Sequence, residues 1–274
     1  MSERTFDFTA LDTFQACPEK YRKRMIQDLT PLKIAPALDF GKAIHIALDY
    51  YYKNSNLMSK AIEVFKEAYT REDDPKRTQL IGEQMLIDYA EVYQREPFKI
   101  IDTEVGFTVP IGEYLFSGRL DGLAEWDNQL YVIEHKTTIQ LGPSYFKQFE
   151  MSMQIDGYIY ATEQITGKRC AGVIINAMQP KTKTKKMEDH YARDPITRTE
   201  FERKEFLREI PLLIKDILEK EKSGIFTRTK RSCFSYNYQC PFWDLCKYGE
   251  DDRILKRDFK VEKWEPYKQV MEEA

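Results

Sequence analysis

Residues 115–137, LFSGRLDGLAEWDNQLYVIEHKT, decide the fold of this chain. They contain two strand-like runs separated by Asp127 and Asn128, and both residue types favour tight turns. A short polar turn between two such runs is typical of a β-hairpin. We therefore predict two antiparallel strands in this stretch.

Charged residues lie on both strands of the predicted hairpin. Glu134 and Lys136 are two residues apart, so their side chains should project from one face of the strand while His135 points away. The hairpin should also bring Asp121 close to Glu134. Two neighbouring carboxylates repel each other, and a hard divalent cation such as Mg²⁺ or Mn²⁺ relieves that repulsion. The alternative interpretation is a set of surface charges with a local Glu134–Lys136 ion pair.

Polar residues on two predicted helices could join this acid cluster. Gln154 and Tyr158 are four residues apart and therefore share a helix face, where an amide and a phenol could orient a phosphate or the lysine. His45 could complete a metal site through its neutral imidazole. Each also has an ordinary explanation, because such pairs are common on helices and a lone histidine is often only half-buried.

The remaining sequence alternates between helical and strand-like patterns. Apolar residues at helical spacing predict helices over residues 6–28, 41–53, 57–70, 77–95, 145–166 and 199–222. Runs rich in β-branched residues predict further strands over 99–110 and 171–178. This order predicts an α/β fold in which helices flank a mixed central β-sheet.

The five cysteines are unevenly distributed. Cys233, Cys240 and Cys246 lie within fourteen residues, and Cys17 is followed by proline just as Cys240 is. These four thiolates could hold a [4Fe–4S] cluster or Zn²⁺, and their spacing does not separate the two. Four free or buried thiols are the alternative. Cys170 precedes a buried strand and is expected to be a core thiol.

Composition limits the class of protein. The chain has 274 residues, of which 42% are hydrophobic and 32% charged, and a net charge of −3. These values favour a globular domain and exclude a generically basic DNA-coating protein, although a local groove could still bind nucleic acid. No apolar run is long enough to span a membrane, and no signal peptide begins the chain. We therefore expect a soluble, cytoplasmic protein.

Six short segments in order resemble the PD-(D/E)XK nuclease superfamily. They are FTALDTFQACPEKYR, GKAIH, GRLDG, VIEHKT, QIDGYIYA and C…CPFWDLC. The order is similar to that of the RecB-like branch with an iron–sulfur staple, which includes the AddB C-terminal nuclease and the RecB-like exonucleases of CRISPR adaptation. The resemblance covers about residues 6 to 247 and implies a restriction-endonuclease-like core with a helical insertion and a C-terminal iron–sulfur staple.

The resemblance implies a role for each residue of the acid cluster. It makes His45, Asp121 and Glu134 metal ligands, with the carbonyl of His135 completing the metal shell. It makes Lys136 the catalytic lysine.

The resemblance also assigns residues outside the hairpin. Gln154 and Tyr158 match a QxxxY motif that lies at the active site beside the DNA. The four cluster ligands would be Cys17, Cys233, Cys240 and Cys246. The six-residue gap after Cys233 is longer than the two residues expected of the family.

The resemblance predicts a single nuclease domain over residues 1–247. Within it, 57–97 would be a helical insertion and 225–247 a cysteine cluster closing onto the N-terminal helix; residues 248–274 would form a charged tail. The implied activity is Mg²⁺- or Mn²⁺-dependent hydrolysis of DNA, as an exonuclease on single-stranded ends. Basic residues that could line the DNA path are Lys181, Lys183, Lys185, Lys186, Arg228, Lys230 and Arg231.

The resemblance also has consequences for partner proteins, and it leaves two rival functions open. The sequence contains no GxxxxGK[ST] motif, so any helicase motor would be another chain, in recombination, DNA repair or CRISPR adaptation. One rival is a catalytically silent nucleic-acid-binding module. The other is a scaffold subunit stabilised by zinc rather than by an iron–sulfur cluster.

Overall fold

The computed structural model describes residues 4–55, 57–142, 144–180, 186–235 and 238–264. The chain forms two compact units. We call residues 35–107 and 119–203 the sheet unit, and residues 1–34, 108–118 and 204–274 the cysteine unit. The long strands β3 (Lys99–Ile111) and β4 (Tyr114–Trp126) contribute residues to both.

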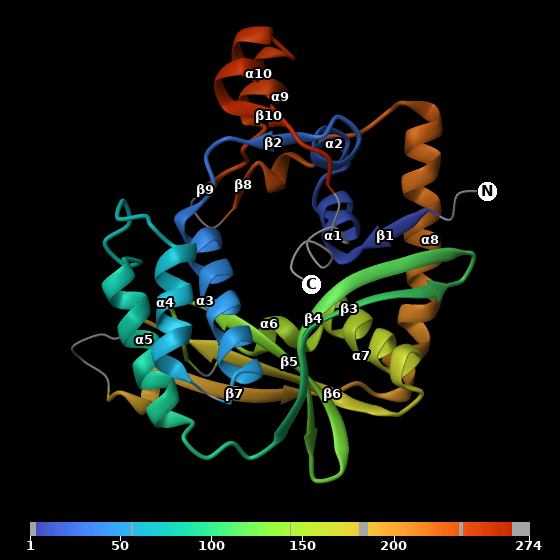
Figure 1. The fold of residues 1–274 in the computed structure, drawn as a ribbon. Helices are drawn as coiled ribbons and strands as arrows, with labels where there is room; N and C mark the ends of the chain where they lie inside the picture. The colour runs from blue at the N-terminus through green and yellow to red at the C-terminus, as the bar shows by residue number, and fades with distance from the viewer. Residues whose placement is uncertain (1–3, 56, 143, 181–185, 236–237, 265–274) are drawn as a thin grey trace. The chain divides into compact units, whose positions relative to one another are not determined.

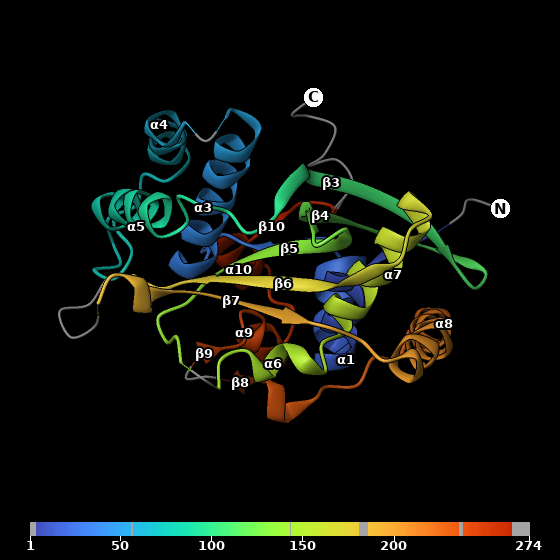
Figure 2. The same ribbon diagram turned by 90° about the horizontal axis from the view of Figure 1, so that it is seen from below.

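The sheet unit contains a mixed β-sheet, as predicted. β4 pairs antiparallel with β5 (Gln129–Thr137), β5 pairs parallel with β6 (Cys170–Met178), and β6 pairs antiparallel with β7 (Tyr191–Ile196). Asp127 and Asn128 form the predicted turn with φ of 51° and 61°, a left-handed region that these two residue types tolerate. Figure 2 shows β5, β6 and β7 side by side.

Three helices gather beside one end of these strands (Figure 1). They are α3 (Pro36–Lys53), α4 (Met58–Ala68) and α5 (Gln79–Val92), close to the predicted positions. Pro36 begins α3, where its missing N–H leaves no hydrogen bond unmade. The buried residues that pack these helices together recur every three or four positions and include Phe40, Ile44, Leu48, Phe65, Met85 and Leu86.

The helix predicted over residues 145–166 is two helices. α6 (Lys147–Glu150) is separated from α7 (Met153–Thr166) by Met151 and by Ser152, whose backbone is extended. The Ser152 carbonyl accepts the first backbone hydrogen bonds of α7, from Ile155 at 3.1 Å and Asp156 at 3.3 Å, and a further one from the buried Arg198 guanidinium at 3.1 Å. α7 then packs on β6, and Gly167 ends it with φ of 65°.

The cysteine unit contains short elements and one long helix. Its ordered elements are β1 (Thr5–Asp7), α1 (Phe8–Ala16), α2 (Pro18–Tyr21), η1 (Arg22–Ile26), β2 (Leu29–Pro31), most of α8 (Glu200–Ser223), η3 (Lys230–Ser232), β8 (Phe234–Ser235), β9 (Tyr238–Gln239), α9 (Trp243–Tyr248), α10 (Asp252–Asp258) and β10 (Phe259–Val261). β1 pairs with the first part of β4, and β10 pairs antiparallel with β2. The stretch after residue 247, expected to be a charged tail, thus contains a helix and a strand.

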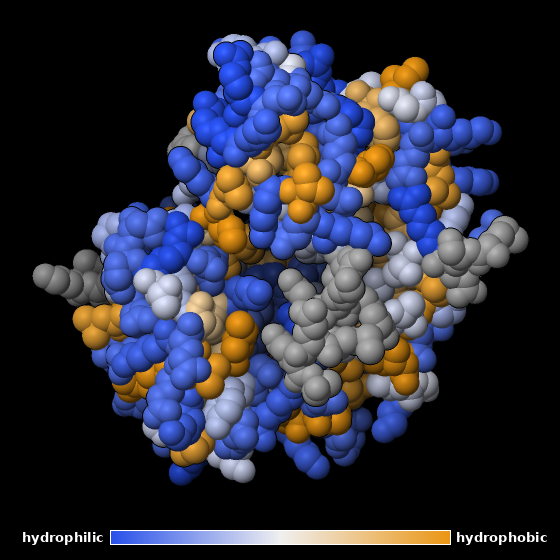
Figure 3. Space-filling model, turned by 45° about the horizontal axis from the view of Figure 1, so that its top comes forward, coloured by the Kyte–Doolittle hydropathy of each residue, from blue (hydrophilic) through white to orange (hydrophobic). Residues whose placement is uncertain are grey.

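No described helix is long and apolar enough to cross a membrane. On the face drawn in Figure 3, hydrophilic residues cover most of the described surface, and hydrophobic ones appear between them.

Gly172 provides a test of the sheet packing. A Cβ built at this β6 position would lie 2.5 Å from the carbonyl oxygen of Ile196 on β7. We expect Gly172→Ala to lower the free energy of unfolding by about 1–3 kcal/mol, measured by urea titration, because the backbone of β7 must shift. Gly142→Ala is the matched control, since nothing lies within 4 Å of its added Cβ; equal stability of the two variants would contradict this packing.

Candidate active site

The β4–β5 hairpin places the two predicted carboxylates side by side. Gly122 lies opposite Ile133 in the antiparallel register. One further step along the two strands brings Asp121 opposite Glu134, and directly opposed residues share one face of a sheet. The predicted proximity of these carboxylates is therefore present in the fold.

Glu134 is at the centre of a hydrogen-bonded group of side chains. Its side chain is 3% exposed, and its Oε1 atom accepts hydrogen bonds from the Lys136 ammonium and from Gln154 Nε2, the latter at 3.1 Å. The same Gln154 nitrogen donates to the hydroxyl of Tyr158 at 2.9 Å. The two predicted residues of α7 thus lie on the same face as Glu134 and Lys136.

His45 reaches the cluster from α3. Its Nδ1 atom lies 3.3 Å from Asp121 Oδ2. Gly41, one turn earlier, allows this approach, because a Cβ at that position would lie only 3.2 Å from Thr137 Oγ1 on β5. The structure therefore brings together the histidine, the two acids and the lysine predicted from the sequence.

Crowded charges shift the pKa values of these groups. Burial, followed by repulsion from Asp121, raises the pKa of Glu134 to about 7. Burial alone would raise the pKa of Asp121, but His45 holds it well below its usual range. Burial alone would lower the pKa of His45, but attraction by Asp121 outweighs it and raises that pKa to about 9. Burial alone would also lower the pKa of Lys136, but attraction by Glu134 outweighs it, and the pKa of Lys136 is raised.

The donor atoms of this cluster fit a divalent cation. The Oε2 atom of Glu134 is buried and has no hydrogen-bond partner among the described residues, which is costly unless a cation binds it. Among the residues that the structure describes, no three His, Cys, Asp or Glu side chains are grouped so that they could hold a metal ion as they stand. Ion pairs occupy Asp121 Oδ2, which faces His45, and Glu134 Oε1, which faces Lys136, so metal binding through these atoms requires the pairs to rearrange.

The His135 side chain points away from Glu134 and Lys136, its neighbours on β5, and its ring lies edge to face with that of His45. The His135 backbone N–H donates to Asp121 Oδ2 at 2.8 Å. Its imidazole is buried, and its Nδ1 atom lies 2.7 Å from the Asn176 amide nitrogen. Burial lowers the pKa of His135 to about 3, so this ring is neutral. The predicted role of its carbonyl as a metal ligand stays a prediction.

A buried polar network continues from Asn176 to the helical insertion. Arg193 Nε on β7 donates to Asn176 Oδ1 at 3.0 Å, and its guanidinium also pairs with Glu96 at 2.5 Å. The Tyr89 hydroxyl accepts from both Asn176 and Arg193. The sequence did not predict this network. The one sequence feature that points to it is Asn176, a lone amide inside an apolar strand run.

Arg119 and Glu104 were also missed. Arg119 precedes Asp121 by two residues on β4, and its Nε atom lies 2.6 Å from Glu104 Oε2 on β3. Burial raises the pKa of Glu104 to about 7, although Arg119 opposes this shift. Glu104 has φ of 53°, which is rare for a residue with a side chain.

The four predicted cluster ligands line one small cavity of the cysteine unit, about 20 Å³ in volume. Cys17 lies between α1 and α2, and its Sγ atom accepts a hydrogen bond from the Thr229 backbone at 3.4 Å. Cys233 and Cys240 flank the β8–β9 pair and are joined by a backbone hydrogen bond of 2.8 Å, and Cys246 lies on α9. Burial raises the pKa of the Cys240 and Cys246 thiols. All four thiols are free.

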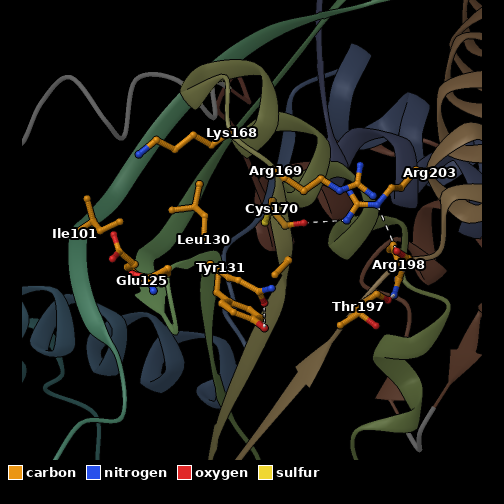
Figure 4. A pocket seen from close by; sticks show the side chains of 13 residues that line it. Ile101, Glu125, Leu130, Tyr131, Lys168, Arg169, Cys170, Thr197, Arg198 and Arg203 are labelled. Atoms are coloured by element: carbon orange, nitrogen blue, oxygen red, sulfur yellow. Dashed lines mark hydrogen bonds between the residues drawn. The ribbon is translucent and has the colours of Figure 1, made fainter.

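A larger cavity of about 690 Å³ lies in the sheet unit at the starts of β5 and β6, at the opposite end of these strands from Lys136 (Figure 4). Arg203 there pairs with Glu163 at 2.7 Å and donates to the Cys170 carbonyl at 2.9 Å. Arg169 pairs with Glu200 and with Glu163. Carboxylates therefore already pair with both of these arginines.

The predicted basic path is only partly described. Lys181, Lys183 and Lys185 lie outside the described residues. The other members, Lys186, Arg228, Lys230 and Arg231, are exposed.

Comparisons with known proteins give a family match and a structural match. A family model for the PD-(D/E)XK nuclease superfamily matches residues 5–247, which is most of the chain. No curated protein sequence gives a significant match.

One solved structure shares the fold, and a second is less similar. A protein from Eubacterium rectale, provisionally described as an exonuclease, superposes with a TM-score of 0.55 at 14% identity, covering 82% of this chain and 84% of that one. The alkaline exonuclease LHK-Exo from Laribacter hongkongensis, solved with dAMP, matches with a TM-score of 0.32 at 14% identity, covering 68% of this chain and 97% of that one. At such identity the first structure shows a shared fold, and the second carries no argument.

The pKa shifts predict how metal binding depends on pH. Below about pH 7 Glu134 holds a proton, and below about pH 9 His45 does, so a cation must displace both protons. We expect the affinity for Mn²⁺, measured by calorimetry, to be at least about tenfold weaker at pH 6 than at pH 8. An affinity that does not change over this range would contradict the assignment of these two residues as ligands.

Proposed function

The chain belongs to the PD-(D/E)XK nuclease superfamily, and we propose that it is a metal-dependent deoxyribonuclease whose active site is formed by His45, Asp121, Glu134 and Lys136. One observation carries this proposal. The β4–β5 hairpin brings both acids and the lysine to one face of the sheet, and α3 adds the histidine. Apolar packing does not explain such a group, whereas metal-assisted cleavage of a phosphodiester can use each of its members.

Each residue has a part in the proposed hydrolysis. A Mg²⁺ or Mn²⁺ ion held by His45, Asp121 and Glu134 would supply Lewis-acid polarisation of the phosphoryl oxygen and a water of lowered pKa. The Lys136 ammonium neutralises negative charge as it develops on the phosphorus oxygens. Gln154 and Tyr158 fix the side chain of Glu134, since Gln154 contacts both.

We further propose an exonuclease that acts on single-stranded DNA ends and belongs to the RecB-like branch. The support is the order of the motifs, from GKAIH through GRLDG and VIEHKT to QIDGYIYA. The exposed residues Lys186, Arg228, Lys230 and Arg231 offer cationic contacts for a DNA backbone.

The proposed setting is the cytoplasm, because all five cysteines are free thiols and that compartment keeps thiols reduced. A separate helicase, recombination or CRISPR-adaptation protein would supply any motor, because the sequence has no phosphate-binding GxxxxGK[ST] loop.

A nuclease assay tests the active site directly. With Mn²⁺ and a labelled single-stranded oligonucleotide, we expect wild-type protein to release nucleotides and Lys136→Ala to act about 10²–10³-fold more slowly. Asp121→Ala should be at least as slow, because it removes a metal ligand.

The control is Arg169→Ala, which removes an exposed positive charge far along the sheet from Lys136 and should retain wild-type activity. Equal cleavage by all four proteins would show a contaminating enzyme. DNA binding without cleavage by wild-type protein would favour the catalytically silent module instead.

We also propose that Cys17, Cys233, Cys240 and Cys246 hold a structural [4Fe–4S] cluster. Four cysteines from two distant stretches of sequence line the same cavity, and among the described residues none of them forms a disulfide. Among the described residues no three cysteines are grouped so that they could hold a metal as they stand, so bound metal requires the thiols to rearrange. Zn²⁺, which needs less space, is the alternative.

Metal content and stability test this second site. We expect purified wild-type protein to contain about four iron atoms per chain, by elemental analysis, as a [4Fe–4S] cluster has. Cys17→Ser should lower both iron content and melting temperature, because metal binding contributes to folding. Cys170→Ser is the control, since Cys170 is buried in the sheet unit and contacts the Gly172 carbonyl. One stoichiometric zinc would identify the alternative metal, and unchanged metal in Cys17→Ser would remove Cys17 from the ligand set.

A further inference from the structure

Arg119 lies on the active face of β4. Side chains two residues apart on a strand share a face, so Arg119 projects beside Asp121, while Leu120 between them is fully buried on the other face. The two Cα atoms are separated by roughly 7 Å, the rise of two strand residues. The Arg119 side chain is 29% exposed, so solvent and ligands can reach it.

Glu104 forms an ion pair with one edge of this guanidinium, although its Oε2 atom makes no hydrogen bond among the described residues. Its Oε2 atom lies 2.6 Å from Arg119 Nε, and the Glu104 side chain is 14% exposed. The unusual φ of 53° at Glu104 interrupts the regular course of β3 at the residue that forms this pair. Strained backbone of this kind persists where the surroundings impose it, and it concentrates at functional sites.

The pair leaves two nitrogen atoms available. Within the described part of the chain, Nη1 and Nη2 of Arg119 have no hydrogen-bond partner, although the Nε edge is occupied by Glu104. A guanidinium paired at Nε leaves both Nη groups for a ligand, and their planar arrangement suits two oxygens of a phosphate. Asp121 and His45 both act electrostatically on Glu104, so the pair borders the acid cluster.

We propose that Arg119 is a further catalytic residue, which binds non-bridging oxygens of the phosphate being cleaved, and that Glu104 is the positioning residue that orients it. This inference rests on the proposed nuclease function. Arg119 would reduce the charge of the phosphate from the β4 side, while Lys136 acts from β5.

Two other roles for this pair are distinguishable. Glu104 could be an additional metal ligand, in which case its loss would weaken the affinity for Mn²⁺. Arg119 could serve only to neutralise the half-buried Glu104, in which case removing both charges together would restore activity. Glu104 Oε2, like Glu134 Oε2, is buried without a hydrogen-bond partner among the described residues, so the Mn²⁺ dependence of Glu104→Gln decides the first role.

Four variants test the proposal: Arg119→Ala, Arg119→Lys, Glu104→Gln and the double variant Arg119→Ala/Glu104→Gln. Arg169→Ala is the matched control, because it also removes a paired surface arginine of the sheet unit. The measurements are single-turnover cleavage of a labelled single-stranded oligonucleotide over a range of Mn²⁺ concentrations, DNA binding by fluorescence anisotropy with Ca²⁺ in place of Mn²⁺, and thermal unfolding.

We expect Arg119→Ala to cleave about 10²-fold more slowly, as the loss of one electrostatic stabiliser typically does, with an unchanged half-saturating Mn²⁺ concentration. Arg119→Lys should recover part of the rate, because it retains a point charge but not the planar pair of donors. Glu104→Gln should lose less than Arg119→Ala, since the guanidinium remains. The double variant should be as slow as Arg119→Ala even if its stability returns to that of wild type.

Each contrary result has a defined meaning. If wild-type protein cleaves no DNA, the proposed function fails. If wild type cleaves and Arg119→Ala matches Arg169→Ala in both rate and DNA affinity, the proposed function stands and the inference about Arg119 is wrong. A double variant that regains the wild-type rate, or a Glu104→Gln variant with weakened Mn²⁺ dependence, also overturns the inference.

Discussion

The repulsion between Asp121 and Glu134 is the constraint on which the rest of the site depends. The hairpin holds two carboxylates next to each other, with Glu134 almost completely buried, where burial disfavours charge on both. Cations offset this from two directions, His45 beside Asp121 and Lys136 beside Glu134. The raised pKa of Glu134 and the lowered pKa of Asp121 show that the compensation is unequal. A buried acid pair that is only partly neutralised by its own protein has a strong affinity for an external cation.

The strand that carries Glu134 is held from its other face. His135 fixes Asp121 through its backbone N–H and contacts Asn176 through its ring. Asn176 then connects to Arg193, and Arg193 to Glu96 in the segment between α5 and β3. Every member of this buried network has a hydrogen-bond partner, and such satisfied networks rigidify a structure. The helices α3 to α5 therefore do more than cover the sheet, because they supply both His45 and the far end of this network.

The sequence predicted the parts of the site that depend on local pattern. The turn at Asp127 and the two-residue alternation along β5 were sufficient to place Asp121, Glu134 and Lys136 on one face, and helical spacing was sufficient for Gln154 and Tyr158. Strand β7 was not predicted, because YARDPI has too many charged residues to resemble a strand; it pairs with the sheet on its β6 side only, where Pro195 is tolerated. The partners of Asn176 and Arg119 were not predictable either, because each comes from a segment distant in sequence, and no periodicity encodes such contacts.

The distribution of donor atoms between the two units separates two kinds of metal chemistry. The sheet unit contributes carboxylates and imidazole to its candidate site, and these hard or borderline donors suit Mg²⁺ and Mn²⁺. Four of the five thiols belong to the cysteine unit, where soft sulfur donors suit iron–sulfur clusters or zinc. The one thiol of the sheet unit, Cys170, is completely buried at the start of β6, whereas the acid cluster lies beside the later part of that strand. Among the residues that the structure describes, the acid cluster thus offers no sulfur ligand to a soft metal. Selectivity between hard and soft metal ions then follows from the donor atoms that each unit contains rather than from affinity alone.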